Sequence, residues 1–330
     1  MSELVRAPGR VNLIGEHTDY TGGLVFPMAI DRWTEIEYVE GGDRVELTSA
    51  DEPDPVSFGL PVTVDPATLS PRWGRYVAAV AAELDAPTGV RGSVSTAIPV
   101  GAGLSSSAAL EMAVGLALGH RGTALDLARL GQRAEHRATG TPTGIMDQLC
   151  IAAAVDGHAL LIDCSTFDVT PSPVPDDVAI LVRFVAHRTI EGSEYGERVA
   201  QCAAAEAVIG PLRIATLDDT LAIDDPTVRA RARHVVSENQ RVRDFAGALA
   251  SGDYRTAGEV MVDGHRSLRD DFATSTPVMD TAVEQLCATP GVFGARMTGG
   301  GFGGCVVALC APGAQVDGWI VRPVAGATRV

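Results

Sequence analysis

Alternating apolar and polar positions predict that strands and helices are interspersed along the whole chain. The longest alternation covers residues 24–39, where β-branched and aromatic side chains recur at nearly every second position, so we expect a strand or hairpin there. An extended stretch begins at Val5 and is expected to break at Pro8-Gly9. Shorter runs predict further strands at 45–48, 62–64, 90–98, 159–162, 178–185, 293–298, 305–309 and 319–322.

Apolar residues spaced three and four apart predict the helices. One follows Pro71, a residue favoured at helix starts, and another follows a glycine-rich loop near residue 101 and ends about Leu118. Thr123 is the expected N-cap of the next helix, which ends before Gly140. A short helix then carries Asp147. The later helices are expected at 194–208, 227–250, 256–265 and 277–287.

The proline-rich segment 171–177 is the clearest break in the pattern. A chain of 330 residues is long enough for one large or two ordinary domains. We therefore predict two domains, residues 1–172 and residues 173–330.

Composition narrows the functional classes. A hydrophobic content of 46% indicates a folded globular protein. The net charge of −16 argues against nucleic acids and anionic membranes as partners, and a nucleotide site would need its own local positive field. All 26 basic residues are arginine. The absence of lysine excludes a Walker-type nucleotide site and a protein-kinase site, because both depend on a lysine.

The first residues contain no apolar core typical of a signal peptide, and no run of 18 apolar residues occurs. We therefore expect a cytoplasmic protein. Six cysteines are scattered without Cys-x-x-Cys spacing, which favours buried, reduced thiols over the alternative of a zinc site.

Residues 99–108, Pro-Val-Gly-Ala-Gly-Leu-Ser-Ser-Ser-Ala, join a predicted strand to an apolar helix. Glycine lets the backbone approach a ligand closely, and a helix N-terminus carries about half a unit of positive charge. The hydroxyls of Ser105, Ser106 and Ser107, in the expected first turn, suit phosphate oxygens or Mg²⁺. The segment predicts a phosphate loop; the alternative is a serine N-cap behind an ordinary loop.

Residues 7–20 place Arg10, Glu16, His17 and Asp19 around two glycines. These polar residues alternate with apolar ones, which argues against a simple exposed loop. Carboxylates and a histidine placed together suit the hydroxyls of a sugar or polyol, so we predict a polyol site; a charged surface loop is the alternative.

Three further features are candidate parts of a site. Asp147 opens a helix after the breakers at 142–144, and Glu135 lies on the preceding helix. Helix capping for Asp147 and a solvated surface charge for Glu135 remain the alternatives. Residues 299–304, Gly-Gly-Gly-Phe-Gly-Gly, separate two predicted strands. Glycine weakens a strand by about 0.5–1 kcal/mol, so this loop is expected to approach a ligand or another loop closely.

Together these motifs resemble the GHMP small-molecule kinase family, and residues 8–23 are similar to the signature of its galactokinase branch. The order and spacing of the motifs also match, as do residues 144–148, 193–198 and 294–299. The resemblance implies an α+β fold with an N-terminal ribosomal-protein-S5-like domain, a C-terminal ferredoxin-like α/β sandwich and an active site between them. It implies ATP and Mg²⁺ as cofactors, a sugar substrate, and a monomer or weak dimer.

The resemblance also implies roles for individual residues. Asp147 matches the catalytic base that faces the sugar C1 hydroxyl, and Arg10 matches the arginine that steadies the transition state. Sugar contacts are implied for Glu16, His17, Thr18, Asp19, Gly144 and Tyr195. A phosphate loop is implied for Gly101, Ala102, Gly103, Leu104, Ser105, Ser106 and Ser107. Magnesium ligands are implied for Ser107 and Glu135, and part of the adenine pocket for Trp73 and Tyr76.

The chain departs from the family pattern at His136, where Asn is frequent, and at Thr143, where Cys is frequent. The segment 184–189 also differs from the usual Thr/Asn-rich strand end. These differences bear on which sugar is used more than on the reaction. The implied activity is ATP-dependent phosphorylation of D-galactose at C1. The alternatives are a kinase for N-acetylgalactosamine or L-arabinose and, less favoured, a sugar sensor without turnover.

Overall fold

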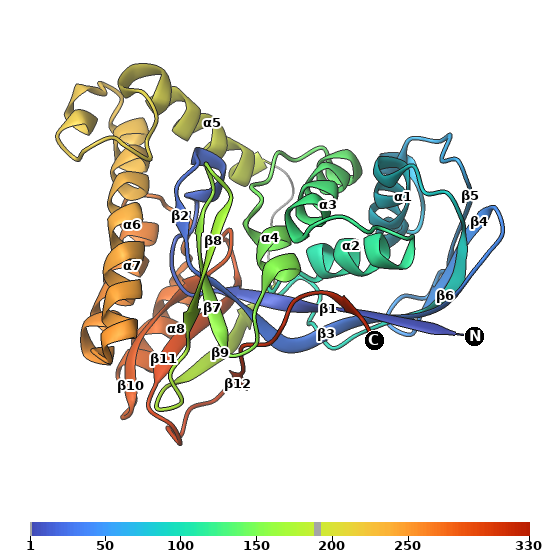
Figure 1. The fold of residues 1–330 in the computed structure, drawn as a ribbon. Coiled ribbons are helices and arrows are strands. Elements are labelled where there is room, and N and C mark those ends of the chain that lie inside the picture. Colours follow the sequence, from blue (N-terminus) through green and yellow to red (C-terminus); the bar gives the residue numbers. More distant parts are fainter. Residues whose placement is uncertain (1, 188–192) are drawn as a thin grey trace.

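A computed structural model describes residues 2–187 and 193–330. Its three sheets are a six-stranded sheet in the order β13-β1-β3-β6-β4-β5, a four-stranded sheet in the order β10-β11-β9-β12, and a three-stranded sheet in the order β2-β7-β8 (Figure 1). The strands are β1 (Glu3–Asn12), β2 (Leu24–Val25), β3 (Pro27–Glu40), β4 (Arg44–Ser49), β5 (Val56–Gly59), β6 (Val90–Thr96), β7 (His158–Asp163), β8 (Asp168–Pro173), β9 (Ala179–Ala186), β10 (Val292–Thr298), β11 (Gly304–Cys310), β12 (Trp319–Val321) and β13 (Thr328–Arg329).

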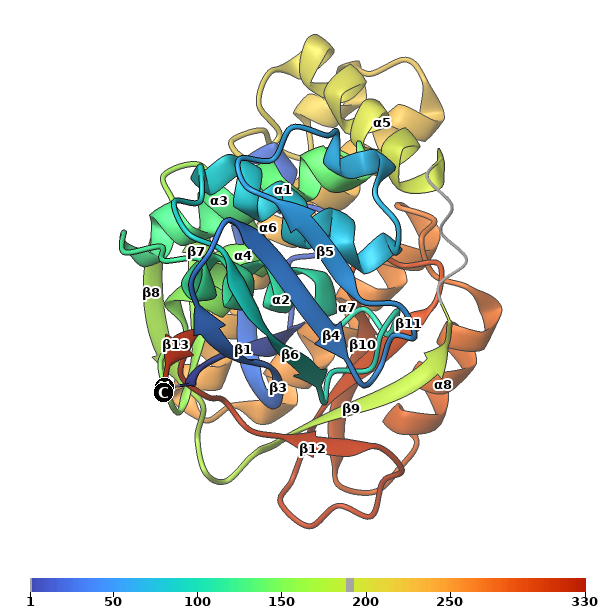
Figure 2. The same ribbon diagram turned by 90° about the vertical axis from the view of Figure 1, so that its right-hand side faces the viewer.

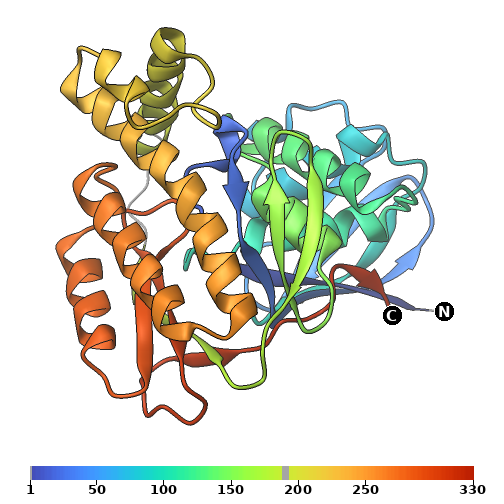
Figure 3. The ribbon, with the colours of Figure 1, turned by 60° about the vertical axis from the view of Figure 1, so that its left-hand side comes forward.

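The α-helices form two groups. They are α1 (Arg72–Leu84), α2 (Ser106–Ala117), α3 (Ala124–Thr139), α4 (Met146–Ala153), α5 (Ser193–Ile209), α6 (Pro226–Ser251), α7 (Tyr254–Asp270) and α8 (Pro277–Cys287). Helices α1 to α4 lie together on one side of the six-stranded sheet, as Figure 2 shows. Helices α7 and α8 pack on β10 and β11, and the long helix α6 runs beside α7 (Figure 3).

Helix α2 shows how the sequence builds the first group. Its residues are apolar on nearly every side, which is typical of a helix surrounded by protein. It packs against β1 and β3 and against α1, α3 and α4. Met112 and Val114 are buried in the same core as Ile36 of β3 and Val80 of α1. The N-terminus of this central helix opens onto the glycine loop predicted to bind phosphate.

Strand β11 is the central, buried element of the second half of the chain, as α2 is of the first. All seven of its residues are buried, as expected for a strand covered on both faces. Alternate side chains enter two different cores. Cys305, Val307 and Leu309 join the core that contains β1 and α2. Val306, Ala308 and Cys310 join a second core, which also contains residues of α8. The two halves of the chain therefore share the first of these cores.

Most predicted elements are present, with three corrections. The expected strand at 62–64 is wrong, because β5 lies earlier, where Val56 and Phe58 alternate inward against β4. The expected break at Pro8-Gly9 is wrong, since β1 continues to Asn12 with only a shift in its register to β3. The segment 171–177 is not all linker, because residues 171–173 complete β8 and pair with β7.

The division between residues 172 and 173 falls one residue before the end of β8 and remains a prediction. Strand β13 returns to pair with β1, so the chain crosses between the halves more than once. A further link joins residues 286 apart in sequence: the Asn12 N–H donates to Thr298 Oγ1 at 3.2 Å, and that hydroxyl donates to the Asn12 carbonyl at 2.8 Å. The link holds the end of β1 against the end of β10.

Five of the six cysteines are buried, and no disulfide joins any of the six. Cys287, at the end of α8, is exposed, so the expectation of buried thiols is wrong for that residue. Within residues 2–187 and 193–330, no cluster of three or more His, Cys, Asp or Glu side chains is arranged to hold a metal ion. In the same part of the chain, no helix combines the length and apolar character needed to cross a membrane.

Candidate active site

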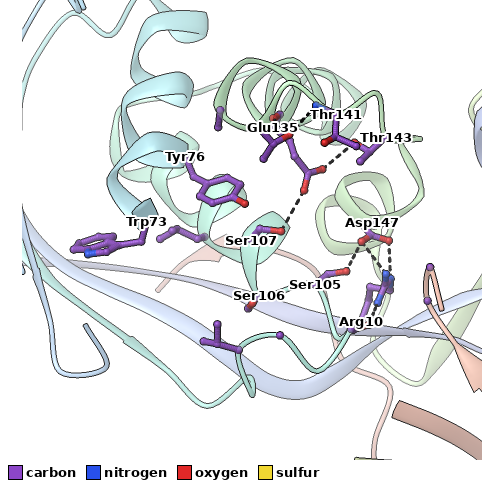
Figure 4. Close-up of a pocket in the computed structure, with 18 of the residues that line it drawn as sticks. Arg10, Trp73, Tyr76, Ser105, Ser106, Ser107, Glu135, Thr141, Thr143 and Asp147 are labelled. Atoms are coloured by element: carbon purple, nitrogen blue, oxygen red, sulfur yellow. Dashed lines mark hydrogen bonds and ion pairs between the residues drawn. The ribbon is translucent and has the colours of Figure 1, made fainter. Parts of the chain in front are cut away.

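A cavity of about 920 Å³ collects residues from every motif singled out in the sequence. Figure 4 shows the part of it around the N-terminus of α2. The lining residues that the sequence predicted are Arg10, Glu16, His17, Asp19, Trp73, Tyr76, Gly101, Gly103, Ser105, Ser106, Ser107, Glu135, Gly144, Asp147 and Tyr195.

The Asp147 carboxylate is held by two side chains in this cavity. Arg10, on β1, donates from Nε to Oδ1 at 2.7 Å and from Nη2 to Oδ2 at 2.8 Å, which is the bidentate geometry of a strong arginine–carboxylate pair. Arg10 Nη1 also donates to the Gly103 carbonyl at 2.7 Å. The Ser105 hydroxyl forms a short hydrogen bond to Asp147 Oδ2. These contacts join β1, the glycine loop and α4 at one point.

The glycine loop adopts conformations that its sequence permits. Gly101 and Gly103 have φ of 75° and 80°, in the left-handed region that favours glycine. Ser105 also has a positive φ, 60°, which is uncommon for a residue with a side chain and turns its hydroxyl toward Asp147. Ala102 and Leu104 are buried, and neither lines the cavity. Their contribution to the loop is therefore through the backbone, as in the bond from the Arg10 N–H to the Leu104 carbonyl.

Gly9 shows why glycine is needed beside this loop. A Cβ at Gly9 would lie 2.9 Å from the Leu104 carbonyl oxygen and 3.2 Å from the Ile98 side chain. The close approach of β1 to the loop brings Arg10 alongside Asp147.

Glu135 and Ser107 face each other next to the loop. Ser107 Oγ lies 3.3 Å from Glu135 Oε1, while Oε2 of the same carboxylate accepts from Thr143 Oγ1 at 3.0 Å and from Gln148 Nε2 at 2.8 Å. Burial and the nearby Asp147 raise the pKa of Glu135. One carboxylate oxygen is thus anchored by protein donors, and the other points toward a serine hydroxyl. Oxygen donors of this kind fit Mg²⁺, which takes one or two protein ligands and completes its shell with phosphate and water.

The sugar side of the cavity is the part lined by the predicted sugar-binding residues Glu16, His17, Asp19, Gly144 and Tyr195. Burial and the Asp147 carboxylate raise the pKa of Asp19 to about 6. A Cβ at Gly144 would lie 1.8 Å from Asp19 Oδ2, so only glycine fits there. Glu16 is 2% exposed, and burial raises its pKa to about 7 even though Arg296 lowers it.

Aromatic rings close this side of the cavity. His17 has a positive φ of 63°, and its ring centroid lies 5.6 Å from that of Tyr195 and 4.5 Å from that of Phe272. Thr18 does not line the cavity. Its hydroxyl lies within hydrogen-bonding distance of two carbonyl oxygens, Gly15 at 2.9 Å and Leu24 at 2.7 Å, so the side chain holds the turn that presents its neighbours.

At the other end of the cavity, Trp73 and Tyr76 project from α1, as Figure 4 shows. Trp73 Nε1 donates to the Asp54 carbonyl at 3.1 Å, which fixes the ring at the edge of the cavity. Flat aromatic side chains beside a phosphate loop suit a nucleobase. Arg72 and Arg75 also line this end, and sequence reasoning did not select them.

The third glycine loop approaches another loop closely, as expected, and the approach to a ligand stays a prediction. Gly299 and Gly300 line the cavity, and a Cβ at Gly301 would lie 2.5 Å from the carbonyl oxygen of Thr274 in another loop. Arg296, just before this loop, pairs with Glu16 through a contact that sequence reasoning missed. The sequence pointed to Arg296 only through segment 294–299, which matches the family pattern.

Comparisons with known proteins identify the family to which this site belongs. The galactokinase galactose-binding signature matches residues 2–38, the GHMP kinases N terminal domain matches residues 74–155, and the GHMP kinases C terminal domain matches residues 245–318. A galactokinase from Chloroflexus aggregans is 42% identical, over 98% of this chain and 88% of its own length. The chain belongs to the galactokinase family.

Other members of the galactokinase family support the assignment. The human galactokinase is 43% identical over 92% of this chain and 83% of its own. The crystal structure of Lactococcus lactis galactokinase complexed with galactose superposes with a TM-score of 0.91 at 32% identity, covering all of this chain and 95% of the other. A mevalonate kinase structure, at 21% identity and a TM-score of 0.68, shares the fold. The α+β GHMP kinase fold expected from the sequence is confirmed.

Proposed function

We propose that this chain transfers the γ-phosphoryl group of ATP to the C1 hydroxyl of D-galactose, giving galactose 1-phosphate and ADP. The observation that carries the proposal is the convergence of Arg10, Asp147, the glycine loop and the sugar-side residues on one cavity. The membership of the galactokinase family supports galactose as the acceptor. The sugar would lie beside Asp19 and the triphosphate along the glycine loop, so that the C1 hydroxyl and the γ-phosphate meet next to Asp147.

Asp147, Arg10 and the N-terminus of α2 have different roles in the reaction. Asp147 accepts the proton of the C1 hydroxyl while the C1 oxygen bonds to the γ-phosphorus and the bond from that phosphorus to the ADP oxygen breaks. Phosphoryl transfer has a loose transition state, so most of the catalysis is positioning and charge stabilisation. Arg10 keeps Asp147 aligned and contributes positive charge, and the N-terminus of α2 attracts the phosphates.

Magnesium fits beside this helix. Ser107 and Glu135 would hold the ion, and Thr143 and Gln148 would keep the Glu135 carboxylate in place. When bound, Mg²⁺ supplies positive charge that offsets the charge of the triphosphate.

Replacing Glu135 with glutamine is expected to raise the Mg²⁺ concentration for half-maximal activity about tenfold or more, because a neutral amide is a weaker ligand than a carboxylate. A magnesium titration at saturating galactose and ATP measures the change. Glu83→Gln is the matched control, because Glu83 pairs with Arg133 and Arg137 on the surface, away from the cavity. Equal magnesium dependence of Glu135→Gln and the unaltered enzyme would contradict the assignment of Glu135.

Sugar specificity is expected to come from Glu16, His17, Asp19 and Tyr195. Buried polar groups reject an analogue that leaves them unpaired, so kcat/KM for galactose should exceed that for glucose by about 100-fold or more. An assay that couples ADP release to a colour change, run with galactose, glucose, N-acetylgalactosamine and L-arabinose, measures this. A higher kcat/KM for one of the last two sugars would assign that sugar instead. Galactose binding without ADP release would indicate a sensor.

We further propose a cytoplasmic monomer or weak dimer. Six cysteines without a disulfide suit a reducing compartment, and the net charge of −16 keeps copies of the chain apart at low ionic strength.

A further inference from the structure

A buried group of charged side chains joins the sugar side of the cavity to the second half of the chain. Arg296, on β10, is fully buried, and its Nη2 lies 2.5 Å from Glu16 Oε2 and 2.8 Å from Glu238 Oε1. Glu238 lies on α6 and is also fully buried. One guanidinium nitrogen therefore bridges a carboxylate that lines the cavity and a carboxylate that does not.

Glu238 also holds the backbone of the sugar-side loop. Its Oε1 accepts the Gly15 N–H at 3.0 Å, and its Oε2 accepts from Arg241 Nε at 2.6 Å. On the other carboxylate, Glu16 Oε1 accepts the Gly299 N–H at 3.2 Å. Both oxygens of Glu16 are thus held by residues 296–299, so the direction of its carboxylate is set by β10 and the loop after it.

The two carboxylates share Arg296 unequally. Burial raises the pKa of Glu238, but Arg296 and Arg241 outweigh it and hold that pKa well below its ordinary value. Glu16 receives less compensation, because Glu238 repels the same negative charge that Arg296 attracts. Removing Glu238 would take away one of the two carboxylates that hold Arg296 Nη2 and the acceptor of the Gly15 N–H, which makes the geometry of Glu16 sensitive to Glu238.

We propose that Arg296 and Glu238 are positioning residues for sugar binding: Arg296 directs the Glu16 carboxylate, and Glu238 fixes both Arg296 and the Gly15 N–H. The inference rests on the proposed function, since it takes Glu16 as a ligand of a sugar hydroxyl. Neither positioning residue lines the cavity, so both act through Glu16 and its loop. The planar guanidinium suits this role because its donors are rigidly arranged.

Steady-state kinetics of Glu238→Ala test the proposal. The KM and the Kd for galactose should rise about tenfold or more, while kcat and the KM for ATP stay within about threefold. Glu238→Gln keeps a carbonyl oxygen for the Gly15 N–H and for Arg296, and Arg241 is partly exposed and free to turn away. This variant should therefore keep its galactose KM within about threefold of the unaltered enzyme.

Leu249→Ala is the matched control for simple loss of stability, because Leu249 is fully buried on the same helix and contacts the hydrophobic core. It should lower Tm and leave the galactose KM unchanged. If Glu238→Ala also lowers Tm without changing the galactose KM, the role is structural only and the proposal is overturned. If Glu238→Ala does not fold, Arg296→Lys carries the same test, and an unchanged galactose KM in that variant overturns the proposal.

Hydrogen exchange separates this inference from the proposed function. In the protein without sugar, the Gly15 N–H should exchange faster in Glu238→Ala than in the unaltered chain, since its acceptor is gone. Equal exchange rates would overturn the positioning role. Absence of galactose phosphorylation by the unaltered protein would overturn the proposed function. The exchange rate of the Gly15 N–H would still test whether Glu238 positions the loop.

Discussion

Asp147→Asn is expected to lower kcat about 10³-fold while the Kd for galactose changes by less than about tenfold. The amide cannot accept a proton from the C1 hydroxyl, and a positioned general base contributes about 10²–10⁴-fold to the rate. It also turns an NH₂ group toward Arg10 or Ser105, both of which are donors to Asp147 in the unaltered protein. The sugar retains its other partners, so binding is affected less.

The coupled ADP assay measures kcat, and calorimetry measures galactose binding. Asp163→Asn is the matched control, since Asp163 also pairs with an arginine, Arg213, but does not line the cavity. Its kcat should remain near that of the unaltered enzyme. Turnover of Asp147→Asn at a near-normal rate would remove Asp147 from its assigned role.

Arg10→Lys is expected to lower kcat about 10²-fold or more, although the positive charge is conserved. Lysine is a point charge on a flexible stem, whereas Arg10 donates to both oxygens of Asp147 and to the Gly103 carbonyl from one rigid plane. The loss corresponds to about 3 kcal/mol of transition-state stabilisation, which is the range for one preorganised donor.

Arg6→Lys serves as the control for Arg10→Lys. Arg6 lies on the same strand, over the ring of Trp33 and outside the cavity, so its replacement should leave kcat within about twofold. A kcat for Arg10→Lys equal to that of Arg6→Lys would show that the bidentate contact to Asp147 does not contribute to the rate.

The local parts of the site were predictable from the sequence because each carries its own signal. The glycines at 101 and 103, the serines that follow and the Thr123 cap specify a loop and two helix starts through rules that act within a few residues. The strand at 56–59 was missed because only two inward side chains, Val56 and Phe58, mark it. A longer alternation would have been needed to separate it from the valines at 62 and 64.

The positioning contacts were not predictable for a different reason. Glu238 lies in the middle of a long polar helix, where a glutamate is ordinarily a solvated surface charge, and the sequence does not reveal that Arg296 lies opposite it. Thr18 illustrates the reverse case, since it stands inside the sugar motif but its hydroxyl bonds the backbone of its own turn. A partner distant in the sequence decided the role of Glu238, whereas the backbone geometry of a single turn decided that of Thr18.

The link between Asn12 and Thr298 has a consequence for how the protein becomes active in a cell. On the ribosome, residue 12 is made long before residue 298, so β1 leaves the exit tunnel without the partner that holds its end. The core around α2 also stays incomplete until β11 has been made, because Cys305, Val307 and Leu309 belong to it. Galactose likewise has no finished pocket to occupy until the third glycine loop has been translated. Free sugar therefore cannot assist the folding of the first half during synthesis, and it stabilises only the completed chain.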